Sequence, residues 1–322
     1  MTAGNKISFI IPVYNAAPFL PRLLESLQAQ DGDGDWEALF TDDGSLDASL
    51  GILQEAADRD ARIRVFEISH EGSSGARNKG LDNATGDIIA FIDADDFIHP
   101  QLIKTVLSYF DDVAVDAVMY DFMPTAPDAT PVFPEISIPP LVTTVTDPIK
   151  WALKPWNPTA HGVWRTFYRR SIIGEIRFFP KIKHQDLLFS YQVWGKVGKM
   201  LKLDCTLYAY VQTPNSVIRS GYSIDKIEAN FIIIRELYKY YINHMNVRRL
   251  LQRSLFPKRV KEVWKQVSRS EASFSGPMHR AFFENVRIAL KLGIISLWSF
   301  LPSKIFIFFF GLLRERILKS NE

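Results

Sequence analysis

The sequence predicts an α/β protein with a mostly parallel, Rossmann-like sheet, followed by a helical C-terminal region. Over the first 120 residues, short apolar runs that end in polar clusters alternate with segments of helical spacing. That is the pattern of strands joined by crossover helices. The charge then reverses, from a net −8 over residues 1–247 to a net +10 over residues 248–322, which indicates a region with a different role.

Length and composition exclude several classes of protein. The chain has 322 residues, 47% of them hydrophobic and 23% charged, so it is not largely disordered and can build a sizeable core. Cys205 is its single cysteine, which excludes a disulfide framework and fits a reducing compartment. The apolar run Ile7–Val13 lacks the length and the basic leader of a signal peptide. We therefore expect a cytoplasmic protein.

The elements of the predicted sheet follow in order. Ile7–Val13 is a short apolar run ended by Asn15 and predicts a buried strand. Further strands are predicted at Trp36–Thr41, Ile63–Ile68, Asp87–Ile92, Asp116–Phe122 and Leu201–Val211. Helices are predicted over Leu20–Leu27, after the cap Asp47, around Ala76–Ala84, over Pro100–Phe110, around Asp186–Lys196 and over 224–243. Residues 123–148 are rich in Pro and Thr and are expected to form an irregular connection.

Polar clusters directly follow three of the predicted strands. They are Pro12–Asn15, Asp42–Asp47 and Asp93–Asp96. In a parallel sheet, ligands bind at the carboxyl ends of the strands. We therefore expect the three clusters to meet at one edge of the sheet and to form the functional site.

The cluster Asp93–Asp96 places three carboxylates within four residues. Like charges this close repel one another, and a hard divalent cation such as Mg²⁺ or Mn²⁺ removes the conflict. The alternative is an acidic helix start, since Pro100 opens a helix soon afterwards. Asp42–Asp47 fits a tight turn with a helix cap, and one of its two adjacent aspartates could instead accept a hydrogen bond from a nucleobase.

The segment Gly75–Gly80 opens a predicted helix and carries Arg77 and Lys79. It matches neither a Walker P-loop nor the GxGxxG fingerprint of dinucleotide-binding folds. The two cations could face an anionic ligand or simply be solvated.

Four strings in series resemble the family 2 glycosyltransferases of the GT-A fold. They are IIPVYN (Ile10–Asn15), DDGSLD (Asp42–Asp47), GARNKGL (Gly75–Leu81) and GDIIAFIDADD (Gly86–Asp96). Looser matches follow at Val163–Ile173, His184–Phe189 and Tyr208–Ser220. The resemblance implies a mixed sheet, with a nucleotide-sugar-binding half at 1–120, an acceptor-binding half at 121–223 and a helical region at 224–322.

The same resemblance implies a nucleotide-sugar donor, usually linked to UDP, a divalent metal (Mn²⁺ or Mg²⁺) and inversion at the anomeric carbon. Asp95 would be the chief metal ligand, and Asp96 would support it. The residues implied to bind the donor are Pro12, Tyr14, Asn15, Asp42, Arg77, Asp93 and Ala94.

Asp186 is the residue that we expect to act as general base. Inversion by a single displacement needs one group to deprotonate the acceptor hydroxyl, and the resemblance places Asp186 opposite the donor. Capping of the following helix is the simpler alternative. The chain departs from the family pattern at Gln185, where the family often has Glu, and His184 is a neighbour that could contact the acceptor.

The C-terminal region combines basic and apolar side chains. Val260, Val263, Trp264 and Val267 form an apolar stripe, with Lys and Arg on the other side of the helix, and a second stripe runs from Phe282 to Leu301. Either stripe could be an interfacial membrane anchor or could pack against the catalytic domain. Ile305–Leu313 is too short for a span of roughly 20 residues. We expect a monotopic anchor on the cytoplasmic leaflet of the inner membrane, with a broken span or re-entrant hairpin as alternatives.

These observations favour an enzyme that builds a bacterial surface polysaccharide or lipopolysaccharide from a UDP-sugar and a glycan or lipid-linked acceptor. A sugar nucleotidyltransferase is one alternative, but it would usually carry a Gly-rich basic loop where this chain has Val13–Ala17. A catalytically inactive membrane-bound relative is the other, and the joint presence of Asp42, Asp93, Asp95 and Asp186 argues against it.

Overall fold

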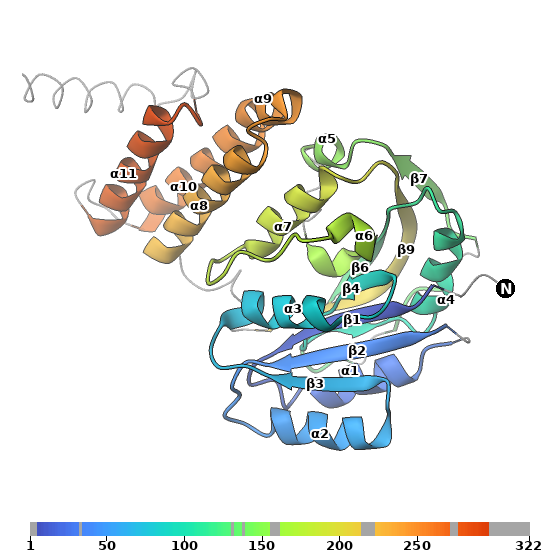
Figure 1. Ribbon diagram of the computed structural model, residues 1–322. Coiled ribbons are helices and arrows are strands. Elements are labelled where there is room, and N and C mark those ends of the chain that lie inside the picture. The colour runs from blue at the N-terminus through green and yellow to red at the C-terminus, as the bar shows by residue number, and fades with distance from the viewer. Residues whose placement is uncertain are drawn as a thin grey trace, which may run out of the picture. The chain divides into compact units, whose positions relative to one another are not determined.

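A computed structural model describes residues 5–31, 34–129, 132–136, 139–154, 162–213, 223–270 and 276–295. The chain forms two compact units, residues 1–220 and residues 221–322. The first contains the sheet and its helices, and the second is helical in its described part (Figure 1).

The sheet of the first unit is mixed, as the family resemblance implies. Its described strands run in the order β3-β2-β1-β4-β8-β6-β9-β5, and β7 pairs with β9. Strands β1 to β4 are parallel to one another, β8 is antiparallel to both of its neighbours, and β9 is parallel to β6. The strands are β1 (Ile7–Val13), β2 (Trp36–Asp42), β3 (Ile63–Glu67), β4 (Ile88–Phe91), β5 (Phe97–Ile98), β6 (Ala117–Thr125), β7 (Val142–Val145), β8 (Thr166–Arg169) and β9 (Met200–Val211).

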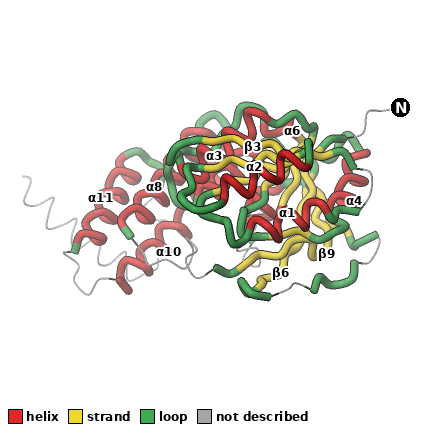
Figure 2. Tube along the Cα trace, turned by 90° about the horizontal axis from the view of Figure 1, so that it is seen from below, coloured by secondary structure: helices red, strands yellow, loops and turns green. Residues whose placement is uncertain are grey.

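Helices cover both faces of the parallel strands (Figures 1 and 2). Ile7, Phe9 and Ile11 of β1 pack into one core with the buried leucines of α1 and with α2 and α4. Ile10 points to the other face, where α3 approaches so closely that a Cβ at Gly80 would lie 2.6 Å from its Cγ2. The helices of this unit are α1 (Leu20–Gln28), α2 (Ser49–Arg59), α3 (Gly72–Asn83), α4 (Leu102–Leu107), α5 (Pro148–Ala152), α6 (Arg170–Ile173) and α7 (Gln185–Trp194), with short 3₁₀ helices at Ser108–Asp111 and Val163–Arg165.

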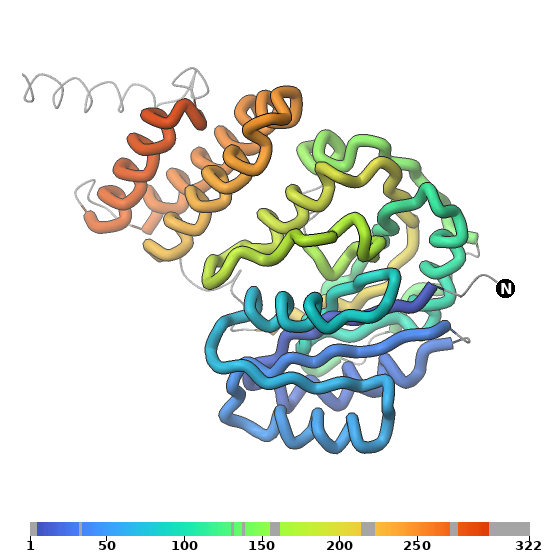
Figure 3. The backbone as a smooth tube through the Cα atoms, viewed as in Figure 1, coloured from blue at the N-terminus to red at the C-terminus, as the bar shows by residue number. Residues whose placement is uncertain are grey.

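The predicted elements of the first 120 residues are all present, with bounds that shift by a few residues. The region 123–148 is less irregular than expected, because β6 extends to Thr125 and β7 covers Val142–Val145. The short strand β5 was not predicted. It exists through its pairing with β9, which lies more than 100 residues further along the chain but beside it in space (Figure 3).

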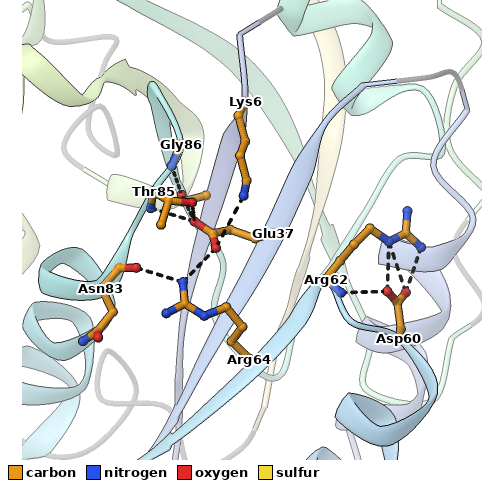
Figure 4. A network of polar contacts seen from close by, with 9 residues as sticks. Lys6, Glu37, Asp60, Arg62, Arg64, Asn83, Thr85 and Gly86 are labelled. Atoms are coloured by element: carbon orange, nitrogen blue, oxygen red, sulfur yellow. Dashed lines mark hydrogen bonds and ion pairs between the residues drawn. The ribbon is translucent and has the colours of Figure 1, made fainter.

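A network of polar side chains ties the amino ends of the strands together (Figure 4). Glu37 of β2 is buried and accepts hydrogen bonds from Ser8 Oγ (2.7 Å), from the N–H and hydroxyl of Thr85 (2.7 and 2.8 Å) and from Arg64 (2.9 Å). Burial alone would raise the pKa of Glu37, but these donors outweigh it and lower the pKa to about 2.

The second unit packs its described helices around the apolar stripes that the sequence shows. Val260, Val263 and Val267 are at most 1% exposed, and the ring of Trp264 contacts the rings of Phe282 and Phe283. The apolar stripe of α10 is therefore packed against helices of its own unit. The helices are α8 (Ile224–Tyr240), α9 (Met245–Arg253), α10 (Leu255–Ser270) and α11 (Pro277–Lys291).

Within the described part of the chain, no helix is both long and apolar enough to cross a bilayer. The segment Ile305–Leu313 lies outside the described residues, and so do Leu297 and Leu301, the last two members of the second stripe.

Candidate active site

The structure brings the polar clusters after β1 and β2 together. Val13 pairs with Asp42 at the ends of the two strands, and the loops that follow are cross-linked. The N–H of Asn15 donates to Ser45 Oγ (2.9 Å), and Asn15 Oδ1 accepts from the N–H of Leu46 (2.8 Å). Asn15 adopts φ +48°, a left-handed conformation that Asn tolerates better than most residues. Its side chain therefore fixes the turn.

Asp42 is 2% exposed, and its two oxygens have different surroundings. Oδ2 accepts from the N–H groups of Gly44 (3.1 Å) and Ser45 (2.9 Å), which closes the turn. Oδ1 is buried and has no hydrogen-bond partner in the described structure. A buried acceptor without a donor is costly, so this oxygen is unusual among the buried polar atoms of the site.

Asp43 has a different role from its neighbour. Its oxygens accept from the N–H groups of Glu71 (2.7 Å) and Gly72 (2.8 Å), at the start of α3. It therefore caps a helix that lies almost 30 residues further along the chain. This explains why the sequence has two adjacent aspartates where the turn itself needs only one.

Pro12 and Tyr14 lie on the same edge as Asp42. Pro12 is the partner of Thr41 within the β1–β2 pair. Tyr14 is 50% exposed and packs edge-on against the ring of His70, with 5.9 Å between the ring centroids. An exposed aromatic ring at this edge of the sheet is a suitable surface for a planar base.

Arg77 connects α3 to the loop after β4. Its Nη2 lies 2.6 Å from Asp93 Oδ1, and its guanidinium lies 5.3 Å from the ring centroid of Phe178. The side chain is buried, and its Nε has no hydrogen-bond partner in the described structure. Of the two roles considered for Arg77, a solvated surface cation is therefore wrong. Ala94, the neighbour of Asp93, is also buried.

The aspartates of the Asp93–Asp96 turn are not equivalent. Asp96 is 1% exposed and accepts from the hydroxyl of Tyr208 (2.6 Å) and from the N–H of Val211 (2.7 Å). Burial, and then the charges of Asp95 and Asp93, raise the pKa of Asp96 well above its ordinary value. Both oxygens of Asp96 are engaged by protein donors, so it braces the turn and faces no ligand.

Asp95 is only partly buried, and its Oδ2 accepts a long hydrogen bond from Thr213 Oγ1 (3.4 Å). Burial, followed by the charge of Asp93, raises the pKa of Asp95 to about 6. The ionised form thus lacks a compensating cation. Asp95 is the carboxylate of this turn that would gain most from binding one.

The donor set suits a metal that is held largely by its substrate. The described residues contain no group of three or more His, Cys, Asp and Glu side chains arranged around a common point, which excludes a metal cage built from protein side chains alone in that part of the chain. Mg²⁺ and Mn²⁺ are commonly held by one or two carboxylates together with substrate phosphates. Asp95, with Asp93 beside it, fits that arrangement.

Asp186 lies in the first turn of α7, and its Oδ1 accepts from the N–H of Leu187 (3.0 Å). No hydrogen bond or ion pair joins it to the Asp93–Asp96 turn in the described structure. The preceding residue, Gln185, links α7 to α3. Its side chain is buried and bonds to the hydroxyls of Ser73 and Ser74 at the start of α3, the helix that carries Arg77.

Comparison with known proteins agrees with these observations. Residues 8–177, more than half of the chain, match the model of the glycosyl transferase family 2. The chain belongs to the family 2 glycosyltransferases. It is 31% identical over 225 residues to the uncharacterized glycosyltransferase EpsJ of Bacillus subtilis, and 31% identical over 228 residues to YibD of Escherichia coli, which carries the same description. These matches cover 67% and 68% of this chain and 64% and 65% of the two relatives, so the chain spans slightly less than two thirds of their length.

Solved structures show that the fold is GT-A. The crystal structure of residues 1–349 of Staphylococcus aureus TarS in complex with UDP-GlcNAc superposes with a TM-score of 0.62 at 22% identity, covering 79% of this chain and 72% of the other. The mannosyltransferase PcManGT of Pyrobaculum calidifontis, in complex with GDP-Man and Mn²⁺, gives a TM-score of 0.52 at 15% identity, covering 90% and 81%.

The departure of this family 2 chain from the usual pattern at Gln185 has a local physical reason. The amide donates through Nε2 to Ser73 Oγ and accepts through Oε1 from Ser74 Oγ. A carboxylate offers only acceptors. Gln185 thus serves as a link between α7 and α3, whatever a Glu does elsewhere in the family.

Sequence reasoning on this family 2 chain missed three side chains that shape the site. Tyr208 contacts the Asp93–Asp96 turn, and Asp43 caps α3, as described above. Asn78 pairs with the backbone of Phe178, donating from Nδ2 to its carbonyl (2.9 Å) and accepting from its N–H (2.8 Å). Asn78 lies within the quoted string GARNKGL, so the signal was present, but its partner is 100 residues away.

Proposed function

We propose that the chain is an inverting glycosyltransferase that moves a sugar from a UDP-sugar to a hydroxyl of a glycan or lipid-linked acceptor, in the synthesis of a bacterial surface polysaccharide or lipopolysaccharide. The observation that carries the proposal is a pair of carboxylates at one sheet edge that the protein compensates incompletely. Asp42 has a buried oxygen without a donor in the described structure, and burial and the charge of Asp93 raise the pKa of Asp95 to about 6.

The nucleotide half of the donor is assigned to the edge formed by Pro12, Tyr14 and Asn15. The single unpartnered oxygen of Asp42, Oδ1, matches the single ring N–H of uracil. The Watson–Crick edge of guanine presents two donors side by side, which one unpartnered oxygen does not satisfy. The likeness to TarS, whose crystal structures hold UDP and UDP-GlcNAc, supports uridine as the nucleoside.

The diphosphate is assigned to Asp95, Asp93 and Arg77. A divalent cation bound at Asp95 would supply charge neutralisation to the diphosphate as it departs. Arg77 is held against Asp93, and its buried Nε has no hydrogen-bond partner in the described structure. Mn²⁺ in the structure of PcManGT with GDP-Man supports a divalent cation here.

The reaction that we propose is a single displacement with Asp186 as base. The acceptor hydroxyl oxygen forms a bond to the anomeric carbon while the bond from that carbon to the diphosphate oxygen breaks. The hydroxyl proton passes to the Asp186 carboxylate, and UDP leaves with the electron pair of the broken bond. Attack opposite the leaving group inverts the anomeric centre.

Donor consumption tests this function without knowledge of the acceptor. The full chain is incubated with UDP-, GDP- and dTDP-sugars, with Mn²⁺ or with EDTA, and released nucleoside diphosphate is measured. We expect slow hydrolysis of one UDP-sugar that requires the metal. Hydrolysis that proceeds equally in EDTA would refute the role of Asp95. Release of pyrophosphate from UTP and a sugar phosphate would instead identify a nucleotidyltransferase.

A further inference from the structure

Helix α10 of the second unit has two opposite faces. Its inner face is apolar and buried, with Val260, Val263 and Val267 at most 1% exposed. Its outer face carries four exposed cations spaced three or four residues apart, which places them in a single row along the helix. We call this row the basic stripe: Lys258, Lys261, Lys265 and Arg269.

The basic stripe is not neutralised within the described part of the chain. None of its four side chains forms an ion pair with an acidic side chain there, and Glu262 is the one acidic residue of α10. The stripe covers 12 residues, or about 16 Å at 1.5 Å per residue. Four like charges in a row repel one another, and an anionic partner lying alongside would relieve that repulsion.

We propose that the basic stripe docks the protein on the anionic surface of a lipid bilayer, by electrostatic attraction and without insertion of α10. A straight row of cations fits a plane of phosphates, and clusters of four to eight Lys and Arg on a helix are typical of such contacts. In this proposal α10 stays on the membrane surface, because its apolar face is buried within its own unit.

The neighbouring sequence favours lipid over nucleic acid as the partner. No aromatic side chain lies within the stripe to stack on bases, since Trp264 contacts the rings of Phe282 and Phe283. The chain also continues beyond the described residues into the apolar sequence of Ile305–Leu313. The docked leaflet would be the cytoplasmic one, where anionic lipids are exposed to a cytoplasmic enzyme.

Vesicle binding with a charge-matched control tests the stripe. The triple variant Lys258→Gln, Lys261→Gln, Lys265→Gln removes three charges from the stripe and keeps good helix formers. The control Lys104→Gln, Lys150→Gln, Lys196→Gln removes three exposed charges from the first unit. Each full-length protein is sedimented with vesicles of phosphatidylcholine alone, or with phosphatidylcholine vesicles in which about a third of the lipid is phosphatidylglycerol.

We expect the wild type and the control to bind the anionic vesicles alike, and salt to weaken the binding. The stripe variant should bind roughly fivefold more weakly per lysine removed, or about 100-fold in all. Equal losses of vesicle binding in both triple variants would mean that net charge explains the binding, and would overturn the role of the basic stripe. If the wild type bound neutral vesicles as tightly as anionic ones, or bound duplex DNA more tightly than anionic vesicles, the assignment of lipid as the partner would be overturned.

A second inference rests on a different observation, the contacts of Tyr208 in the first unit. This side chain is 0% exposed, and its one hydroxyl reaches two points of the acidic turn. It donates to Asp96 Oδ2 (2.6 Å) and accepts from the N–H of Asp93 (3.1 Å). The ring is held in place by Trp164, which stacks on it with 4.8 Å between the centroids.

Strand β9 and the residues directly after it therefore contact the turn at several points. Ile98 of β5 pairs with Tyr208 directly after the turn, the N–H of Val211 binds Asp96, and Thr213 follows next to Asp95. We infer that Tyr208 is a positioning residue, which fixes where the Asp95 carboxylate lies for a divalent cation. This inference rests on the proposed function, because that function supplies the cation.

Metal binding separates the inference from the function on which it rests. Mn²⁺ affinity is measured by electron paramagnetic resonance in the presence of UDP for the wild type, for Tyr208→Phe and for Tyr168→Phe. The control removes a buried hydroxyl on β8 that lies beside Thr166 and Ser190. We expect Tyr208→Phe to lose about 10- to 100-fold in Mn²⁺ affinity, the range seen when the partners of metal ligands are removed.

Each outcome is decisive for one of the two claims. If the wild type binds no Mn²⁺ with UDP, the proposed function fails. If the wild type binds Mn²⁺ and Tyr208→Phe binds it equally well, or if Tyr168→Phe loses as much, Tyr208 has only a structural role. A fall in melting temperature without a fall in Mn²⁺ affinity also overturns the inference.

Discussion

The two ends of the parallel strands differ in how the protein compensates the charge of a carboxylate. At the amino ends, Glu37 receives hydrogen bonds from Ser8, Thr85 and Arg64, and its pKa falls to about 2. At the carboxyl ends, burial and the charge of Asp93 raise the pKa of Asp95 to about 6. The same sheet thus holds one acid that is easily ionised and one that resists ionisation.

The difference shows what each end is for. A carboxylate that the protein satisfies with its own donors stabilises the fold, whereas an unsatisfied one costs stability and is retained where a ligand completes it. Asp42 fits the second case as well, because one of its oxygens is buried without a donor in the described structure. The presence of ion pairs does not distinguish the two ends, because each end has a close one: Arg77–Asp93 at the carboxyl ends and Arg64–Glu37 at the amino ends.

The largest effect that we predict is the loss of sugar transfer on a substitution at the carboxyl ends of the strands. Asp95→Ala should abolish sugar transfer, and no concentration of Mn²⁺ should restore it, because the diphosphate loses the carboxylate that holds its cation. Glu37→Gln, at the amino end, should leave turnover of the folded protein near that of the wild type. Steady-state transfer assays measure both. Comparable losses of turnover in the two folded variants would remove the functional distinction between the ends.

The second prediction concerns Asp186, which lies on α7 and outside both strand ends. Asp186→Asn keeps the side-chain volume but removes the basic oxygen, so turnover should fall by about 10²–10⁴-fold. Binding of UDP, measured by calorimetry, should change little. A variant with normal turnover would move the general base elsewhere, and His184, which precedes α7, would be tested next.

Much of the carboxyl end could be predicted from the sequence for a physical reason. Parallel strands place their carboxyl ends at one edge, so the clusters after Val13, Thr41 and Ile92 had to converge. The role of Tyr208 could not be predicted, because it depends on β9 pairing with β5 and lies 112 residues from Asp96. The stripe of α10 could not be assigned either, since an amphipathic helix has the same periodicity against lipid or protein.

The third prediction concerns stability at the amino end. The pKa of Glu37 in the folded protein, about 2, lies below its ordinary value of 4.5. Its contribution is therefore complete above pH 4.5 and is lost as the pH falls toward 2. The shift corresponds to roughly 3 kcal/mol, so Glu37→Gln should lower the free energy of unfolding by about that amount at pH 7.

Chemical denaturation at several pH values checks this sign. The difference between wild type and Glu37→Gln should shrink as the pH is lowered from 5 to 3, in a window of about two units. Asp60→Asn is a suitable control, because the Asp60–Arg62 pair lies near the same end but on the surface, where such pairs contribute about 0–1 kcal/mol. A deficit for Glu37→Gln that does not depend on pH would mean that packing, and not ionisation, explains the effect.

The smallest effect that we predict is that of Asp95, at the carboxyl end, on stability. Its sign is opposite to that of Glu37. The pKa of Asp95 in the folded protein, about 6, lies above its ordinary value of 3.8. The folded protein therefore loses stability as the pH rises from 3.8 through 6. In EDTA at pH 7.5, Asp95→Asn should be more stable than the wild type, by about 1 kcal/mol once partial exposure of the carboxylate is allowed for. At pH 4 the two should unfold alike.

Adding the cation should reverse that order. Mn²⁺ with UDP binds the folded wild type and raises its melting temperature by mass action, while Asp95→Asn lacks the carboxylate and gains little. Thermal unfolding in EDTA and then in Mn²⁺ with UDP measures both states on the same samples. A wild type that is more stable than Asp95→Asn even in EDTA at pH 7.5 would show that the protein's own donors already satisfy Asp95. In that case the contrast between the two ends of the sheet would not hold.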